Sequence, residues 1–273
     1  MTRPPRPTEQ LRRIRVDGQD LRVCVRPGAA AGPPLLLCNG IGASLELLQP
    51  FVDAVDQRIT VIRFDVPGVG GSPLPRRPYR FSSLARLLNR LLSRLGHDRF
   101  DVLGISWGGG LAQQIALQYR RRCRRLVLVA TGTGALMVPA RPAVLAKMIT
   151  PRRYRDPAYA AAVAAELYGG RLRSEPELAR TLLHDHSRVG TRRGYRLQLL
   201  AGLGWTSLPV LPLIRQRTLI LAGTDDPIIP LANARLLRTG IPRAELIVYD
   251  DGHLGLITRA DELGPAVSAF LRP

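Results

Sequence analysis

Residues 100–111 read FDVLGISWGGGL, and this stretch indicates how the whole chain folds. Its first half, Phe100–Ile105, is a short apolar run typical of a buried strand, and a helix is expected from Leu111 to Tyr119. Between them stands Gly104-Ile105-Ser106-Trp107-Gly108, a serine flanked by glycines in a sharp turn. Such a turn lifts the serine hydroxyl out of the sheet and directs the helix N-terminus at it. We therefore predict that Ser106 is a nucleophile. The alternative is an ordinary glycine-rich turn between a strand and a helix.

Strand-like and helix-like segments alternate on both sides of this turn. Strands are expected over residues 21–25, 34–38, 59–64, 126–130, 218–221 and 246–249. A leucine-faced helix is expected over Ser82–Leu95, with Ser82 or Ser83 capping its start. A last helix is expected over Glu262–Leu271, with Pro265 in its first turn. The alternation predicts an α/β fold, with a mostly parallel sheet and helices on both faces.

The alternation breaks between about Met137 and Pro212. This stretch lacks clear strands and contains several prolines and helical patches, such as Tyr159–Leu167 and Glu177–His184. We expect it to form a helical cap, inserted after the sixth strand, over the ends of the strands where sites form. The predicted domains are a core of residues 1–136 and 213–273 and a cap of residues 137–212.

The chain carries a formal net charge of +19, almost entirely from arginine. Such a charge can indicate a nucleic acid, an anionic surface or an acidic substrate as partner. The arginines are spread along the chain and no nucleic-acid recognition motif is present, so we expect a compositional bias and no nucleic-acid partner. The densest run, Arg120–Arg125, is expected at the solvated end of a helix.

The cysteines fit neither a disulfide framework nor a zinc motif; they are Cys24, Cys38 and Cys123. Cys38 ends the apolar run Leu35–Leu37 and is expected in the core. We find no metal or cofactor signature. Residues 1–10 lack the apolar region of a signal peptide, and no stretch is apolar enough to span a membrane. These features predict a cytoplasmic protein, whose oligomeric state the sequence leaves open.

With a serine turn between a strand and a helix, the chain resembles serine hydrolases of the α/β-hydrolase fold, whose order is serine, acid, histidine. His253 follows a predicted strand near the C-terminus, where that order places the base that takes the serine proton. His97 is expected to be a solvated residue at a helix end. His184 and His186, two residues apart, do not share a helix face and are not expected to bind a metal.

The acid that orients the base is expected after the strand at 218–221. Gly223–Pro230 reads GTDDPIIP and resembles the hydrolase pattern G-x-x-D-x-x-x-P, which selects Asp226. Asp225 is the main alternative, and its other expected role is to cap the loop. Some hydrolases place the acid after the preceding strand, but no Asp or Glu occurs between Arg120 and Arg155.

The same resemblance implies where the oxyanion of the tetrahedral intermediate is bound. The expected donors are the backbone N–H groups of Trp107 and of Ile41. Many relatives carry His-Gly where this chain has Asn39-Gly40, but a backbone donor does not require the histidine. Asp65–Ser72, a glycine-rich loop, is expected to shape the pocket wall. The substrate pocket is expected to be largely apolar and to include Asn39, Met137, Trp205 and Leu254.

Residues 16–271 resemble, more specifically, the intracellular depolymerases of medium-chain-length polyhydroxyalkanoates, which are bacterial storage polyesters. In the core the resemblance rests on residues 36–48, 64–72, 106–109, 221–230 and 250–254. In the cap it rests on Pro151–Tyr154, Tyr168–Gly170 and Ala201–Ser207. Because caps shape substrate pockets, the cap segments bear on the substrate more than the triad does. Gly110, where alanine is expected, and the far more basic surface are departures.

The resemblance implies hydrolysis of the polyester to 3-hydroxy acids or oligomers through an acyl-enzyme on Ser106, with the storage-granule surface as a partner. A capped esterase or lactonase acting on a small soluble apolar ester has the same triad and is the first alternative. A non-catalytic binding protein is a second, but it has no physical need for Ser106, Asp226 and His253 together.

Overall fold

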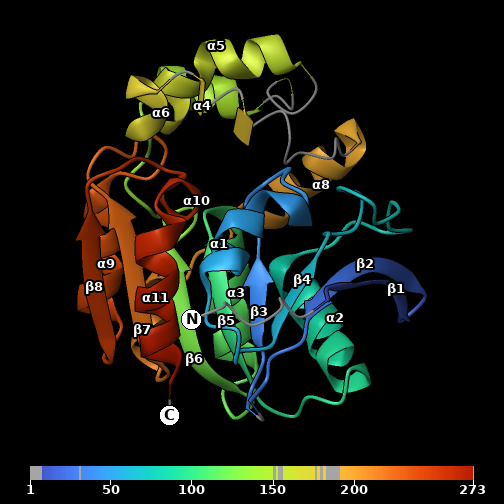
Figure 1. The fold of residues 1–273 in the computed structure, drawn as a ribbon. Coiled ribbons are helices and arrows are strands. Elements are labelled where there is room, and N and C mark those ends of the chain that lie inside the picture. The colour runs from blue at the N-terminus through green and yellow to red at the C-terminus, as the bar shows by residue number, and fades with distance from the viewer. Residues whose placement is uncertain are drawn as a thin grey trace, which may run out of the picture.

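An eight-stranded sheet forms the centre of the molecule (Figure 1). The computed structural model describes residues 8–30, 32–149, 152, 156–175, 177–178, 181–182 and 191–272. The strand order is β1-β2-β4-β3-β5-β6-β7-β8; only the β1–β2 and β2–β4 pairs are antiparallel. The strands are β1 Gln10–Val16, β2 Gln19–Arg26, β3 Leu35–Cys38, β4 Val61–Phe64, β5 Phe100–Ile105, β6 Cys123–Val129, β7 Arg217–Gly223 and β8 Ala244–Tyr249. The predicted mostly parallel α/β fold is confirmed.

Helices cover both faces of the sheet, as expected, and each face has its own apolar core. The core helices are α1 Gln49–Ala54, α2 Phe81–Arg94, α3 Trp107–Gln118, α9 Leu231–Gly240, α10 Gly255–Thr258 and α11 Ala260–Leu271, with a 3₁₀ turn, η1, over Leu45–Leu48. Strand β3 shows the division: Leu36 and Cys38 join the core under α2 and α3, whereas Leu35 and Leu37 join the core under α1 and α11. Cys38 is therefore a core residue, and all three cysteines are buried and free.

Between β6 and β7 the chain forms helices above the carboxyl ends of the strands, at the top of Figure 1. These are α4 Pro142–Ile149, α5 Pro157–Tyr168 and α6 Arg171–Ser174. Helix α8 Arg192–Gly202 lies lower in the same view, and the 3₁₀ helix η3 Leu208–Leu213 packs against α9 in the core. The insertion thus follows the sixth strand, while the domain boundaries at 136/137 and 212/213 stay a prediction. Of the expected cap features, Pro151, Arg153, Tyr154 and residues 183–190, with His184 and His186, lie outside the described residues.

The glycine-rich loop Asp65–Ser72 supports the start of α8. A Cβ on Gly194 would lie 1.9 Å from the carbonyl oxygen of Gly68, so the two backbones touch. Thr191 caps α8, and its N–H donates to the same Gly68 oxygen at 3.3 Å. None of the loop residues lines either cavity beside Ser106. The loop therefore has the structural role expected of it: it shapes the pocket wall indirectly, by supporting α8, whose residues Leu199 and Gly202 line the larger cavity.

Several local expectations also differ from the structure. Strand β1 was not expected, because its side chains are largely exposed at the sheet edge and show no apolar alternation. Helix α11 begins at Ala260, two residues before the expected start, so Pro265 lies beyond its first turn. Helix α2 begins at Phe81. Of the two serines proposed to cap it, Ser83 accepts the backbone N–H of Arg80 at 2.9 Å from the third helical position.

The arginine run after α3 is not a helix end, because α3 stops at Gln118. Arg124 and Arg125 belong to β6. The Arg124 guanidinium pairs with Asp101 of β5, and Arg125 donates to backbone carbonyls at the end of α11. Arg124 and Arg125 are therefore not only solvated: Arg124 links two neighbouring strands, and Arg125 links β6 to the C-terminal helix.

A buried carboxylate fixes the loops that follow β3 and β4. The Asp65 side chain is 0% exposed, and burial raises its pKa. Its Oδ1 accepts the N–H of Leu45 at 2.8 Å, and its Oδ2 accepts the N–H of Gly71 at 2.7 Å. Arg22 of β2 donates to Oδ2 at 3.0 Å and also pairs with Glu46. The charge of Asp65 thus depends on Arg22.

We expect Arg22→Met to lower the free energy of unfolding by about 3 kcal/mol, because it leaves Asp65 buried without its cation. Urea unfolding monitored by circular dichroism measures the loss. Arg90→Met is the matched control, since the Arg90–Asp17 pair is 53% and 41% exposed. It should change stability by less than about 1 kcal/mol. Equal losses in the two variants would contradict this role of Asp65.

Candidate active site

Ser106 joins β5 to α3 in a strained backbone conformation, with φ 55° and ψ −122°. The flanking glycines make this turn possible. A Cβ on Gly104 would lie 2.2 Å from the carbonyl oxygen of Gly108, and one on Gly108 would lie 2.1 Å from that of Cys38. The serine is thus held at the carboxyl end of β5, at the N-terminus of a helix, where a reactive hydroxyl is accessible.

Asp226 and His253 come from the loops after β7 and β8 and form a buried hydrogen-bonded pair. His253 Nδ1 lies 2.8 Å from Asp226 Oδ2, and the two side chains are 5% and 1% exposed. The other carboxylate oxygen accepts the N–H groups of Ile228 and Ile229, both at 2.9 Å. Both carboxylate oxygens of Asp226 therefore act as hydrogen-bond acceptors. We assign the proton of the neutral imidazole to Nδ1, which donates to Asp226, so Nε2 is the nitrogen that can accept a proton.

Ser106 and His253 line the same small cavity, of about 30 Å³. Within the described part of the chain, no hydrogen bond joins the Ser106 hydroxyl to His253, as is common in free enzymes before substrate tightens the site. The base is also held from the cap: its backbone N–H donates to the carbonyl oxygen of Tyr168 at 2.7 Å, and the two rings are stacked 6.4 Å apart. The structure therefore brings all three proposed triad residues to one place.

Asp225, the alternative acid, points to the cap. Its Oδ2 accepts the N–H of Gly170 at 2.8 Å, and its Oδ1 pairs with Arg173 at 3.2 Å. Asp251 acts in the same way from the other loop, accepting the N–H of Arg171 at 2.8 Å. Gly169 and Gly170 both have positive φ, and a Cβ on either would lie 2.0 Å from these loops. No role was expected for Asp251. In the sequence, the Gly169-Gly170 pair is the feature that indicates this close contact between the cap and the loops.

The loop after β3 lies against the nucleophile, since a Cβ on Gly40 would be 3.7 Å from Ser106 Cβ. Asn39 shapes this loop: its Nδ2 donates to the carbonyl oxygen of Ser44 at 2.6 Å, and its Oδ1 accepts the N–H of Gly40 at 2.8 Å. The N–H of Ile41 makes no hydrogen bond to the residues that the structure describes. The N–H of Trp107 opens α3, where helix donors lack intrahelical acceptors. Two donors are thus available beside Ser106.

The family model described as "alpha/beta hydrolase fold" matches residues 33–260. This chain belongs to the α/β-hydrolase family. It is 52% identical over 263 residues to a poly(3-hydroxyalkanoate) depolymerase of Ectopseudomonas oleovorans, covering 96% of this chain and 92% of that protein. The predicted resemblance to these depolymerases is confirmed.

Less similar relatives of this hydrolase are named as lactonases. It is 25% identical over 245 residues to 3-oxoadipate enol-lactonase 2 of Acinetobacter baylyi, covering 90% of this chain and 91% of that protein. Among solved structures it resembles the enol-lactonase from Burkholderia xenovorans LB400, with a TM-score of 0.79, 25% identity, and coverage of 94% and 98%. The fold alone therefore does not select the substrate.

A larger cavity of this hydrolase, about 360 Å³, lies between Ser106 and the cap. Its walls are mostly apolar and include Met137, Leu145, Met148, Leu199, Trp205, Ile228 and Ile229. Of the four residues proposed for the pocket, Met137 and Trp205 line this cavity, and Asn39 and Leu254 line the small one. The two cavities share four lining residues, which are Ile41, Ser106, Met148 and Ile228.

Gly110, where the resemblance predicts alanine, also lines the larger cavity. A Cβ there would lie 2.9 Å from the Phe81 ring and 3.1 Å from the Trp205 ring. Trp205 packs edge-on against Phe81 at 5.0 Å, and its indole N–H donates to Gln114 at 2.8 Å. Glycine at this position thus gives room to the aromatic wall of the pocket.

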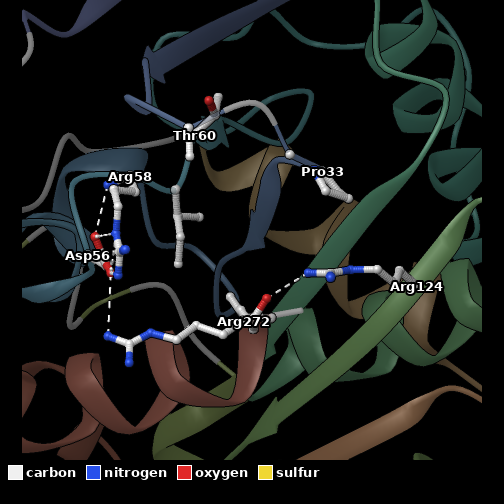
Figure 2. A pocket seen from close by; sticks show the side chains of 10 residues that line it. Pro33, Asp56, Arg58, Thr60, Arg124 and Arg272 are labelled. Carbon is white, nitrogen blue, oxygen red and sulfur yellow. Dashed lines mark hydrogen bonds and ion pairs between the residues drawn. The ribbon is translucent and has the colours of Figure 1, made fainter.

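A separate cavity of about 340 Å³ lies near the C-terminus and contains none of the triad residues. Figure 2 shows its arginines directed at partners: Arg58 and Arg272 reach Asp56, and Arg124 reaches the carbonyl oxygen of Leu271. Its lining includes no serine, cysteine or histidine, and its one carboxylate, that of Asp56, is paired with Arg58 and Arg272. In the described part of the chain we find no cluster of His, Cys, Asp and Glu that could hold a metal ion. No described helix is long and apolar enough to cross a membrane.

His97 lines neither cavity beside Ser106. It lies beyond the end of α2 and is half-buried, and burial lowers its pKa. Its carbonyl oxygen accepts from Arg122.

We expect Asp226→Asn to reduce kcat for a medium-chain aryl ester by about four orders of magnitude, because His253 is then held in the wrong tautomer. Asp225→Asn is the matched control: it removes a carboxylate that binds the cap and makes no hydrogen bond to His253. Its loss should be far smaller. Stopped-flow and steady-state rates compare the two, and a greater loss in Asp225→Asn would show that the acid is misassigned.

Proposed function

We propose that this hydrolase cleaves the ester bonds of a medium-chain-length poly(3-hydroxyalkanoate), releasing 3-hydroxy acids or short oligomers. The observation that carries the proposal is the buried Asp226–His253 pair beside Ser106, under an apolar cavity roofed by the cap. The alignment to a poly(3-hydroxyalkanoate) depolymerase, 52% identical overall, covers 96% of this chain and so includes the cap over the cavity.

The proposed reaction has two halves that use the same groups. His253 Nε2 takes the proton of the Ser106 hydroxyl as its oxygen attacks the ester carbonyl. The N–H groups of Ile41 and Trp107 stabilise the resulting oxyanion. The intermediate collapses to an acyl-serine, and the leaving hydroxyl end of the polymer takes the proton from His253. Water then attacks the acyl-serine with the same base, and the carboxylic acid is released.

The apolar walls favour a substrate with an alkyl side chain. Each buried methylene contributes roughly 0.8 kcal/mol, so preference rises severalfold per carbon and then levels off where the cavity ends. We place the enzyme in the cytoplasm, at the surface of polyester granules. Its formal net charge of +19 would attract it to an anionic granule coat, an attraction that salt weakens.

A small apolar ester or lactone is the second candidate substrate. A cavity of about 360 Å³ is within the size range of small-ligand sites. The similarity to enol-lactonases also favours it. The triad chemistry is identical for both candidates, so only the substrate separates them.

The test is release of 3-hydroxy acids from amorphous medium-chain polyester, measured by chromatography. We expect faster release from this polymer than from short-chain polyester, and a loss on the order of a million-fold in Ser106→Ala. The control for folding is an unchanged circular dichroism spectrum of Ser106→Ala. Activity confined to small soluble esters would reject the polyester substrate and leave the esterase. Full activity of Ser106→Ala would reject the serine mechanism.

A further inference from the structure

Gln198, in the middle of the cap helix α8, is 0% exposed and contacts both sides of the oxyanion site. Its side chain binds the loop after β3, and its main chain binds the residue after the nucleophile. We propose that Gln198 is a positioning residue that sets the N–H groups of Ile41 and Trp107, so that oxyanion stabilisation depends on how α8 is seated. This inference rests on the serine mechanism proposed above, but not on the polyester substrate.

The contact to the loop fixes the peptide next to one donor. Gln198 Oε1 accepts the N–H of Gly42 at 2.7 Å. Gly42 has φ 76°, so without this bond the turn has the conformational freedom of a glycine. The N–H of Gly40 is bound by Asn39 and that of Ala43 by the Gly40 carbonyl. The N–H of Ile41 is therefore left for a ligand, and the Gly42 bond holds the plane of the peptide that follows it.

The contact to the nucleophile turn fixes the other donor. The indole Nε1–H of Trp107 donates to the main-chain carbonyl oxygen of Gln198 at 2.8 Å. Trp107 is the first residue of α3, and its ring packs edge-on against Phe81 at 4.8 Å. A side chain held at both its ring edge and its tip leaves little freedom to the backbone N–H of the same residue.

Burying the amide of Gln198 lowers the stability of the fold. Within the described residues its Nε2 is buried and has no hydrogen-bond partner. Such an unpaired group destabilises a fold by about 1–3 kcal/mol, and an apolar side chain of the same length would avoid the loss. Flipping the amide does not help, because the Gly42 N–H needs an acceptor. The hydrogen bond to Gly42 is thus the interaction for which a polar side chain is needed at this position, and it lies beside the reacting atoms.

Since α8 belongs to the cap, this arrangement links two parts of the site. The start of α8 rests on Gly68, and Leu199 and Gly202 on the same helix line the apolar cavity. An acyl chain that presses on this wall acts on the helix that carries Gln198. Gln198 itself lines neither cavity, so it acts through Gly42 and Trp107 and not by touching substrate.

The test compares Gln198→Met with Gln216→Met on a soluble medium-chain aryl ester. Gln216 is also buried, also makes one amide hydrogen bond, to Ala116 at 2.8 Å, and also has one unpartnered buried amide atom in the described structure, but it lines neither cavity at Ser106. We expect kcat to fall at least tenfold in Gln198→Met, up to the about 100-fold that loss of one oxyanion donor causes. KM should stay within about twofold, because ground-state binding is untouched.

The distinguishing readout is inhibition by an alkyl trifluoromethyl ketone, which forms an oxyanion on the serine, against binding of the matching non-reactive methyl ether. Affinity for the ketone should fall in Gln198→Met in parallel with kcat, while ether binding stays constant. Gln216→Met should change neither. A purely structural role would give equal effects in the two variants. Unchanged kcat and ketone affinity in folded Gln198→Met would overturn the proposal.

If Gln198→Met does not fold, Trp107→Phe removes the indole donor and keeps the backbone N–H. Trp107 also lines the larger cavity, so ether binding is the control for the pocket wall. A fall in kcat and ketone affinity with unchanged ether binding supports the proposal, and wild-type values for both overturn it. The polyester assay does not enter these measurements, so its failure leaves them unaffected. Full activity of Ser106→Ala would instead show that the serine mechanism had failed.

Discussion

The backbone of Ser106 is held at φ 55°, in a region that costs of order 1–3 kcal/mol for a residue with a side chain. The surrounding structure must supply that energy, and it does so by close contact between three backbones. Gly104 of β5 meets Gly108 of α3, and Gly108 in turn meets the carbonyl of Cys38 in β3. The position of the nucleophile thus depends on the central parallel strands being buried and in register, with Leu36 and Cys38 packed under α2 and α3.

The cap is joined to the catalytic loops by hydrogen bonds from its main chain. Tyr168 binds the N–H of His253, Gly170 binds Asp225, and Arg171 binds Asp251. At the other end of the insertion, the Gln198 side chain accepts the N–H of Gly42, and its main-chain carbonyl oxygen accepts the indole N–H of Trp107. The base and the oxyanion site are therefore both supported from the same insertion, whose apolar residues also line the cavity over Ser106. The cap therefore both lines the substrate cavity and orients the base and the oxyanion donors.

The sequence predicted the parts of the molecule that follow a local pattern. The strand, turn and helix around Ser106 are local. The choice of Asp226 over Asp225 followed from the resemblance of Gly223–Pro230 to the hydrolase pattern; the structure places Asp226, and not Asp225, against His253. Contacts between distant segments were not predictable. Nothing near Gln198 in the sequence indicates that its helix reaches Gly42, 156 residues away. Arg124 and Arg125 look like a solvated cationic run until their partners, Asp101 and the end of α11, are known.

The most direct measurement of the central claim is active-site labelling with an alkyl fluorophosphonate, followed by peptide mass spectrometry. The reagent reacts with a hydroxyl that a base activates, and its tetrahedral phosphonyl adduct mimics the tetrahedral intermediate. The account predicts one adduct, on Ser106, formed far more slowly in Asp226→Asn and at close to the wild-type rate in Asp225→Asn. An adduct on another residue, or labelling of Ser106 that is unaffected by Asp226→Asn, would contradict it.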